Sequence, residues 1–201
     1  MISLHQCVEE EIVRTSRILS MIMLFFLSSQ CFHPKLLFGN ELLRPCNINS
    51  IPQKIQNVLS EKYPKWRIVT LEDLSMEHRE LWEKSQNGKD CPGIAIGHFE
   101  NKLSVSYVLS LVPKNGENLG FRLIAFNPIQ NGNYVDKIVE KSNEPSNPQI
   151  VYKVPPGSYS DAEETTSVLL LNDGFQMEEM EKGALLYYWK GGRFHHLIVS
   201  E

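Results

Sequence analysis

The chain has 201 residues, of which 42% are hydrophobic and 22% are charged, and its formal net charge at pH 7 is −4. This composition is typical of one globular domain and excludes collagen, coiled-coil, extensively disordered and polytopic membrane proteins. The negative charge and the lack of a basic patch argue against nucleic acid as a partner.

Residues 1–30 have the layout of a secretory signal peptide. Two arginines precede a nearly pure apolar run, Ile18–Leu27, and two serines follow it. The run is too short to span a bilayer core, which needs roughly 20 residues, but it fits the apolar part of an export signal. A buried N-terminal helix is the alternative. Because the acidic residues Glu9–Glu11 are unusual in such a signal, we hypothesise that the start codon is mis-assigned and that translation begins at Val13.

Cys31 gives a second interpretation of the same region. The stretch Leu27–Cys31 resembles a lipoprotein cleavage box, except that Gln30 stands where a small residue is expected. Lipidation of Cys31 would anchor the chain to a membrane surface without a spanning helix. Ordinary cleavage after Ser29 or after Gly39 is the alternative.

Residues 31–47 contain two prolines and are predicted to be a linker into one α+β domain over residues 48–201. Cys7 and Cys31 lie in or beside the segment that is expected to be removed, which leaves Cys46 and Cys91 in the domain. An even number of cysteines in an oxidising compartment favours a disulfide between them. Two free, buried thiols are the alternative.

Two helices are predicted at the start of the domain. Ser50 is expected to open the first, with Gln53 in capping-box position, and Tyr63-Pro64 is expected to end it. The second is expected to begin at Ser75 and to stop at Asn87-Gly88. The residues expected on its buried stripe are Leu74, Leu81 and Trp82.

After Cys91 the pattern predicts strands joined by turns. Alternation over Leu103–Leu111 places large apolar side chains on one face and serines on the other. A tight connection is expected to join this strand to Ile94–Phe99, and Gly191-Gly192 predicts a two-residue hairpin turn. The other predicted strands are Phe121–Asn127, Tyr134–Glu140, Ile150–Val154, Thr166–Leu171, Phe175–Met180, Ala184–Lys190 and Arg193–Ser200. The predicted fold class is α+β, with two N-terminal helices packed on a mainly antiparallel meander of about six to eight strands.

Histidines and carboxylates are the groups to test for catalysis. Adjacent strand residues point to opposite faces, so only one of His195 and His196 can share a site with His98. Neither metal-ligand spacing nor a nucleophile elbow nor a phosphate-binding loop is found, so no catalytic residue, metal or cofactor is expected. The acidic runs Asp161–Glu164 and Glu178–Glu181 are expected to be solvated surface.

Aromatic side chains around the last hairpin are the better candidates for binding. Tyrosine and tryptophan supply rigid contact area at interfaces. The candidates are Tyr187, Tyr188, Trp189 and Phe194. The alternative is that alternate members belong to the core and the others are ordinary sheet residues.

Two stretches carry a resemblance to a known group of proteins. Cys91-Pro92-Gly93, followed by Gly97–Lys102 and Ser106-Tyr107, resembles a segment of exported bacterial proteins of largely unknown function. In those proteins the segment is similar to the FG-GAP/VCBS-type loop, Gly-Asp-Phe-Asp-Gly-Asp-Gly-x-x-Asp-Tyr, whose acidic residues can hold calcium. The stretch from Tyr187 to the chain end is similar to their closing hairpin.

The acidic ligands of that loop are mostly replaced in this chain. His98, Lys102 and Ser106 stand where the pattern has Asp, and Glu100 alone keeps an acid. Calcium needs about six to eight oxygen ligands. The resemblance therefore implies a degenerate loop, which is a plain hairpin without a metal site.

These observations predict an exported, non-enzymatic envelope protein, periplasmic, secreted or lipid-anchored. It would bind another protein or a surface polymer through a sheet face or the terminal hairpin, with membrane contact only through a lipid anchor. One alternative is a hydrolase whose histidine and carboxylate are brought together by the fold. Another is a small-molecule-binding protein that uses the concave face of the sheet.

Overall fold

A computed structural model describes residues 46–85, 87–115, 120–180 and 182–200, all within a compact unit that covers residues 43–201. The predicted signal peptide, the alternative start at Val13 and the lipidation candidate Cys31 lie outside the described residues. Within the described ranges, no helix has the length and apolar character needed to cross a membrane.

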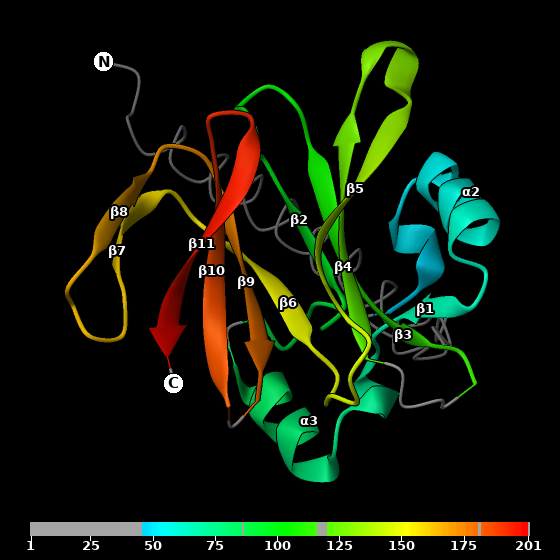
Figure 1. The fold of residues 1–201 in the computed structure, drawn as a ribbon. Coiled ribbons are helices and arrows are strands. Elements are labelled where there is room, and N and C mark those ends of the chain that lie inside the picture. Colours follow the sequence, from blue (N-terminus) through cyan, green and yellow to red (C-terminus); the bar gives the residue numbers. More distant parts are fainter. Residues whose placement is uncertain (1–45, 86, 116–119, 181, 201) are drawn as a thin grey trace, which may run out of the picture. The chain divides into compact units, whose positions relative to one another are not determined.

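The described residues are mainly β-structure with some helix (Figure 1). The helical elements are η1 (Ile48–Ser50), α2 (Gln53–Lys62), η2 (Leu71–Asp73), α3 (Met76–Lys84) and η3 (Gln130–Gly132). The strands are β1 (Trp66–Ile68), β2 (Ile94–Gly97), β3 (Ser106–Pro113), β4 (Phe121–Pro128), β5 (Tyr134–Ser142), β6 (Ile150–Val154), β7 (Gly157–Ser160), β8 (Ser167–Leu170), β9 (Gly174–Glu179), β10 (Gly183–Lys190) and β11 (Arg193–Ser200).

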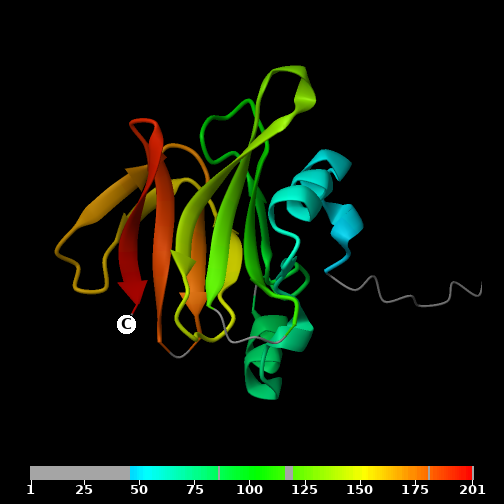
Figure 2. The ribbon, with the colours of Figure 1, turned by 45° about the vertical axis from the view of Figure 1, so that its right-hand side comes forward.

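The strands form two antiparallel sheets and a two-stranded ribbon. The first sheet has the order β1-β3-β4-β5, with β2 also paired to β3. The second has the order β11-β10-β9-β6, and β7 pairs with β8 in the ribbon (Figures 1 and 2). The antiparallel prediction is confirmed, but a single meander is wrong. Strands β3 and β4 are buried on both faces, and such strands need cover on both sides, so the chain builds two packed layers.

The two sheets pack face to face over an aromatic core. Phe175 lies at its centre, stacked on Tyr187 with ring centroids 5.1 Å apart. Phe99 and Phe194 meet Phe175 edge-on at 5.3 Å and 5.2 Å. Aromatic pairs in these geometries add to the stability gained by burying their area, so this cluster holds the layers together.

The predicted alternation is present within β3, where Leu109 and Leu111 join the cluster under α2 and the serines lie on the opposite face, but the strand begins at Ser106 and not at Leu103. Ser106 and Ser110 are fully buried between the sheets, and the Ser110 hydroxyl donates to the Gln149 carbonyl at 2.7 Å. Leu103 is 96% exposed, because the connection between β2 and β3 runs over residues 98–105 and is longer than expected. The Asn101 side chain stabilises this longer loop by accepting from the backbone N–H groups of residues 103 and 104.

Helix α2 covers the outer face of the first sheet, where Ile55 is fully buried (Figure 2). The predicted capping box is wrong, because α2 begins at Gln53 and Ser50 ends a 3-10 turn instead. Ile51 precedes Pro52 and adopts an extended conformation, as a residue before proline usually does, so a helix cannot run through it. The predicted end at Tyr63-Pro64 is confirmed.

Helix α3 begins as predicted, because the Ser75 hydroxyl accepts from the His78 backbone N–H. It ends at Lys84, before the predicted stop at Asn87-Gly88, and Ser85 caps it through backbone bonds to the last turn. Trp82 is buried as expected, whereas Leu81 is 51% exposed and does not belong to the buried stripe.

The predicted disulfide is present. Cys46 and Cys91 are joined with their Cα atoms 4.6 Å apart and 45 positions apart in the sequence. Both residues belong to the apolar cluster around Ile55. The bond therefore fastens the segment that enters α2 to the start of β2.

Candidate functional site

The terminal hairpin forms with the predicted turn. Gly191 and Gly192 have φ values of 59° and 82°, a left-handed pair that side chains other than glycine rarely adopt. Tyr188 pairs with His195 and Trp189 pairs with Phe194 across the two strands. This register sends alternate aromatic residues to opposite faces of the second sheet.

Three of the four aromatic candidates face the first sheet. Tyr187 is 2% exposed, and its hydroxyl donates to a Glu140 carboxylate oxygen at 3.2 Å. Burial, with the nearby Glu140 charge, raises the pKa of Tyr187, so the phenol stays neutral. Trp189 packs edge-on against Phe194 at 4.9 Å, and the Lys137 ammonium lies 5.0 Å from its ring centroid.

Tyr188 faces the other way, towards the ribbon. It lines a groove between β8 and the tip of the terminal hairpin, with a volume of about 580 Å³. We call this the ribbon groove. The side chains that give it its character are Val168, Leu169, Leu171, Tyr188 and Lys190.

The apolar wall of the ribbon groove comes from the run Leu169-Leu170-Leu171. The middle leucine packs into the cluster under the ribbon, whereas Leu169 and Leu171 are 67% and 69% exposed. Gly174 makes this packing possible, since a Cβ atom there would lie 2.7 Å from a Leu170 methyl carbon. Burial of Leu170 alone therefore forces its two neighbours outward.

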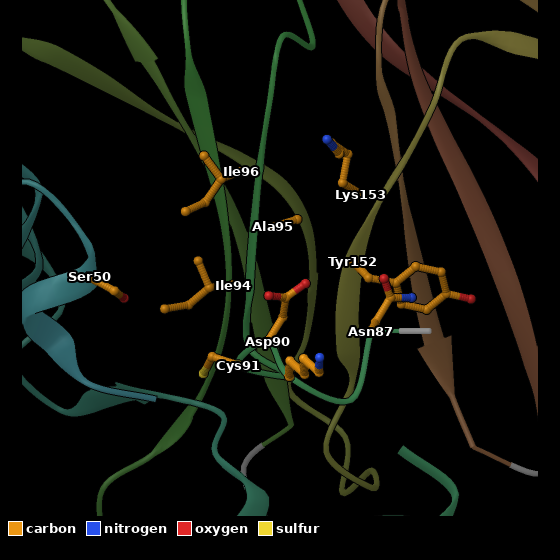
Figure 3. Close-up of a pocket in the computed structure, with 10 residues that line it drawn as sticks. Ser50, Asn87, Asp90, Cys91, Ile94, Ala95, Ile96, Tyr152 and Lys153 are labelled. Carbon is orange, nitrogen blue, oxygen red and sulfur yellow. The ribbon is translucent and has the colours of Figure 1, made fainter. Parts of the chain in front are cut away.

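A second hollow lies between β2 and β6, the edge strands where the two sheets meet (Figure 3). We call it the seam hollow, and its volume is about 320 Å³. Ile94 and Ile96 line it from β2, and Lys153 lines it from β6. The loop before β2 adds two further charged residues, Lys89 and Asp90, beside the disulfide cysteine Cys91.

The structure does not bring the histidines together with a carboxylate. His98 Nδ1 lies 3.2 Å from the Ser104 carbonyl, and its backbone N–H donates to Asp173. The His195 ring stacks on Tyr188 and accepts from Arg193, while the His196 ring lies against Tyr187. Within the described ranges, none of these three rings is hydrogen bonded to a carboxylate, and neither hollow is lined by a histidine.

Glu100, the acid that remains in the loop between β2 and β3, is held by asparagines. Asn127 Nδ2 donates to Glu100 Oε1 at 2.5 Å, and Asn172 donates to the Glu100 backbone carbonyl at 3.0 Å. Burial raises the pKa of Glu100, although the charge of Lys137 acts in the opposite direction. In the described part of the chain, no three His, Cys, Asp or Glu side chains are grouped closely enough to hold a metal ion.

Sequence reasoning missed most residues of both hollows. Leu169 and Leu171 were placed in a predicted strand, but their exposure depends on how the ribbon packs. Lys89 and Lys153 lie 64 positions apart and meet only because β2 and β6 become neighbours. The run Leu169-Leu170-Leu171 was the one signal in the sequence for an exposed apolar site. Successive side chains of a strand point to opposite faces, so a half-buried strand with three consecutive leucines must expose at least one of them.

Comparisons with known proteins give no relative for this chain: no family model, no curated protein and no solved structure matches it.

Proposed function

We propose that this chain is an exported, non-enzymatic binding module that holds an apolar segment of an envelope or extracellular protein in the ribbon groove. The observation that carries the proposal is the exposure of Leu169 and Leu171 beside Tyr188. Clustered exposed apolar side chains in a concave surface mark interaction sites, and Tyr and Trp are the usual anchors of binding energy.

The chemistry of the groove favours a protein segment over a surface polymer. Its valine, leucine and tyrosine side chains match the apolar side chains of a protein better than the hydroxyls of a polysaccharide, and polar residues such as Asn172, Asp173 and Lys190 complete the lining. The volume of about 580 Å³ falls in the range of about 300–1,000 Å³ that is usual for ligand sites. Such a groove accommodates a few side chains and leaves the rest of the partner on the surface.

Export is the second part of the proposal. Its support is the predicted signal peptide over residues 1–30 together with the Cys46–Cys91 disulfide, because disulfides persist in oxidising compartments. Intact mass of the natively expressed chain tests it. A mass beginning at Cys31 with lipid, or at Gln30 or Asn40 without lipid, supports export, and an uncleaved chain from Met1 contradicts it.

The binding site is tested with the full chain immobilised and panned against a phage-displayed peptide library. We expect peptides with Leu, Phe or Trp to be enriched. The double variant Leu169→Asp/Leu171→Asp should weaken their binding at least about tenfold, since charged groups would enter the apolar contact. Met76→Asp is the matched control, because Met76 is 80% exposed on α3, away from the groove.

Two results would contradict the groove as the binding site. One is the enrichment of no apolar peptide, and the other is equal binding by the double variant and by Met76→Asp. A parallel panel of soluble neutral polysaccharides tests the other partner class. Binding there that Leu169→Asp/Leu171→Asp abolishes would replace the protein segment with a surface polymer.

We also propose that the loop between β2 and β3 is a degenerate FG-GAP/VCBS-type loop, which keeps the hairpin but has lost the calcium ligands. Glu100 is engaged by Asn127, and it has no neighbouring acidic ligand in the loop. We expect millimolar calcium to leave the melting temperature of the full chain unchanged. A rise that EDTA reverses would show that the loop still binds the ion.

A further inference from the structure

Strand β8 has a free edge, and this edge borders the ribbon groove. Within the described residues β8 pairs with β7 alone. The lining of the groove includes every residue of β8 and, in the described part of the chain, none of β7. Successive side chains of a strand point to opposite faces, so a surface that touches all of them runs along the edge of the strand. The groove therefore follows the unpaired side of β8.

The register of the ribbon identifies the backbone groups on that edge. The Asp161 N–H donates to the Thr166 carbonyl at 2.9 Å, so these two residues form a hydrogen-bonded pair at the end of the ribbon. In an antiparallel ladder, hydrogen-bonded and non-hydrogen-bonded pairs alternate. Ser167 and Leu169 therefore fall in non-hydrogen-bonded pairs, and their N–H and C=O groups point away from β7.

These outward backbone groups are open to a partner. Within the described ranges, no backbone group of Ser167 or Leu169 has a hydrogen bond outside the ribbon. The alternate residues Val168 and Leu170 bond to β7. The edge thus offers two N–H donors and two C=O acceptors, spaced two residues apart. An added strand presents its own donors and acceptors with the same spacing.

The sequence leaves this edge unprotected. Natural edge strands are usually blunted by charged residues, prolines or bulges. Strand β5, the edge of the first sheet, has both acidic and basic side chains and a bulge in its pairing with β4. Residues 165–171, in contrast, read Thr-Thr-Ser-Val-Leu-Leu-Leu, with no charge, proline or glycine. Such a segment favours pairing with another strand.

The floor beside the edge is the outer face of the terminal hairpin. Tyr188 and Leu197 line the groove there, and the Tyr188 ring stacks on His195. A strand lying along β8 would place alternate side chains on this floor and the others beside the exposed Leu169. Because β8 pairs with one strand only, this addition needs no space between two existing strands.

We propose that the partner segment in the ribbon groove binds as an extended strand, which pairs with the free edge of β8 and makes the ribbon three-stranded. Its backbone exchanges hydrogen bonds with Ser167 and Leu169, and its apolar side chains contact Leu169 and Tyr188. This inference rests on the proposed function of the groove and adds the conformation of the partner. A helical segment or a compact ligand would leave the backbone groups of β8 unpaired.

The probe is the capped peptide Ac-Thr-Leu-Val-Leu-Thr-NH2, titrated into the ¹⁵N-labelled full chain with its disulfide intact. In an added strand, only alternate N–H groups of the peptide face β8. One isomer is methylated at both leucine nitrogens, and the other at the nitrogens of the valine and the last threonine. We expect one of these isomers to bind at least about tenfold more weakly than the probe and the other to bind about as well.

Amide exchange locates the contact. In the free protein the Ser167 and Leu169 amides should exchange rapidly, whereas the Val168 and Leu170 amides, which bond to β7, should exchange slowly. Saturating probe should slow exchange of the first two amides at least about tenfold and leave the other two unchanged.

Ser167→Pro and Ser160→Pro are a matched pair of variants. The two serines lie opposite each other in the ribbon, and their N–H groups face its two free edges. Proline at such a position keeps the β7–β8 ladder and removes the outward donor. Ser167→Pro should weaken the probe about tenfold, and Ser160→Pro should not.

Three results would overturn the strand. They are equal binding by the two methylated isomers, no response of β8 amides at millimolar probe, and protection of the Ser167 and Leu169 amides in the free protein. Protection that grows with protein concentration would assign the edge to a second copy of the chain. If Leu169→Asp/Leu171→Asp abolishes binding but both methylated isomers still bind, the proposed function stands without the strand. If the isomers differ but this double variant binds normally, the strand stands and the apolar groove is contradicted.

Discussion

The outer faces of the two sheets are covered in different ways. Helix α2 covers the first sheet with a fully buried Ile55, and a disulfide and the Asp136 contacts with Lys62 and Tyr63 fasten that side. Over the second sheet, Trp82 of α3 packs against Tyr152 of β6, and the β7–β8 ribbon covers a further part through a small apolar cluster around Leu170. The ribbon leaves Leu169 and Leu171 exposed. Helix α2, which is held by a disulfide and an ion pair, closes the core on its side. The β7–β8 ribbon is held by apolar contacts and leaves a groove that a partner can enter.

The largest expected effect is on the helical cover. Ile55→Ala should lower the free energy of unfolding by about 3–4 kcal/mol, because it removes a fully buried side chain and leaves a cavity between α2 and the first sheet. Urea denaturation measures it, with the half-exposed Ile48→Ala as the control. A loss under about 1 kcal/mol would show that α2 is a loose cover, like the ribbon.

Removing the disulfide should have the next largest effect. The bond closes a segment with a sequence separation of 45 residues. Loop-closure entropy alone gives about 4 kcal/mol as the upper limit of its contribution, and disulfides typically contribute about 2–4 kcal/mol. Cys46→Ser/Cys91→Ser and the reduced wild-type chain should both lose this stability. If the ribbon groove then lost peptide binding as well, the α2 side and the ribbon would be coupled, which would contradict the independence of the two covers.

The ribbon should respond less to the loss of its buried residue. Leu170→Ala should cost about 2 kcal/mol, below the cost of Ile55→Ala, because the side chains next to an open groove can relax into the space. Chemical denaturation of the two variants side by side gives the ranking. The reverse order would mean that the ribbon is the more tightly packed cover.

The Asp136 contacts make the helical cover sensitive to acid. Burial alone would raise the pKa of Asp136, but hydrogen bonds from Lys62 and Tyr63 outweigh it and hold this pKa below its ordinary value. A carboxylate with a lowered pKa stabilises the fold above its unfolded pKa of about 4, and this contribution disappears as the pH falls through the folded value. Between about pH 5 and pH 2, wild type should lose about 1 kcal/mol more than Asp136→Asn. Equal losses would show that the contact adds nothing.

The smallest effect on stability is expected for the two exposed leucines. Leu169→Ala and Leu171→Ala should each change the free energy of unfolding by less than about 0.5 kcal/mol, as substitutions at exposed positions usually do. They should nevertheless weaken the peptides selected on the ribbon groove. Thermal melts together with binding titrations separate the two properties, and a large loss of stability would make these leucines part of the fold.

Local signals predicted the elements well. The strands Ile150–Val154 and Arg193–Ser200, the Gly191-Gly192 turn and the Ser75 cap all follow from short-range chemistry, and the structure has each of them. The disulfide followed from counting cysteines. Such features depend on few neighbours, so the sequence is sufficient to place them.

Features that depend on packing were not predictable in this way. The serines of β3 lie on the face opposite the leucines, as predicted, but the sequence did not indicate that a second sheet would bury this face or that the Ser110 hydroxyl would donate to the distant Gln149 carbonyl. Strand β7 was not expected after Pro155-Pro156, since its pairing with β8 depends on a ribbon that folds back over another sheet. Both hollows form only when the sheets and the ribbon pack together, so they could not be located from the sequence. The binding role predicted for the terminal hairpin stays a prediction.

Hydrogen–deuterium exchange of the full chain, with and without a peptide selected by panning, tests the central claim most directly. We expect bound peptide to slow exchange over β8 and the tip of the terminal hairpin, residues 167–173 and 187–194, and to leave α2 and its neighbouring strands unchanged. Protection over the α2 side, or no change at the ribbon groove with peptide bound, would contradict it.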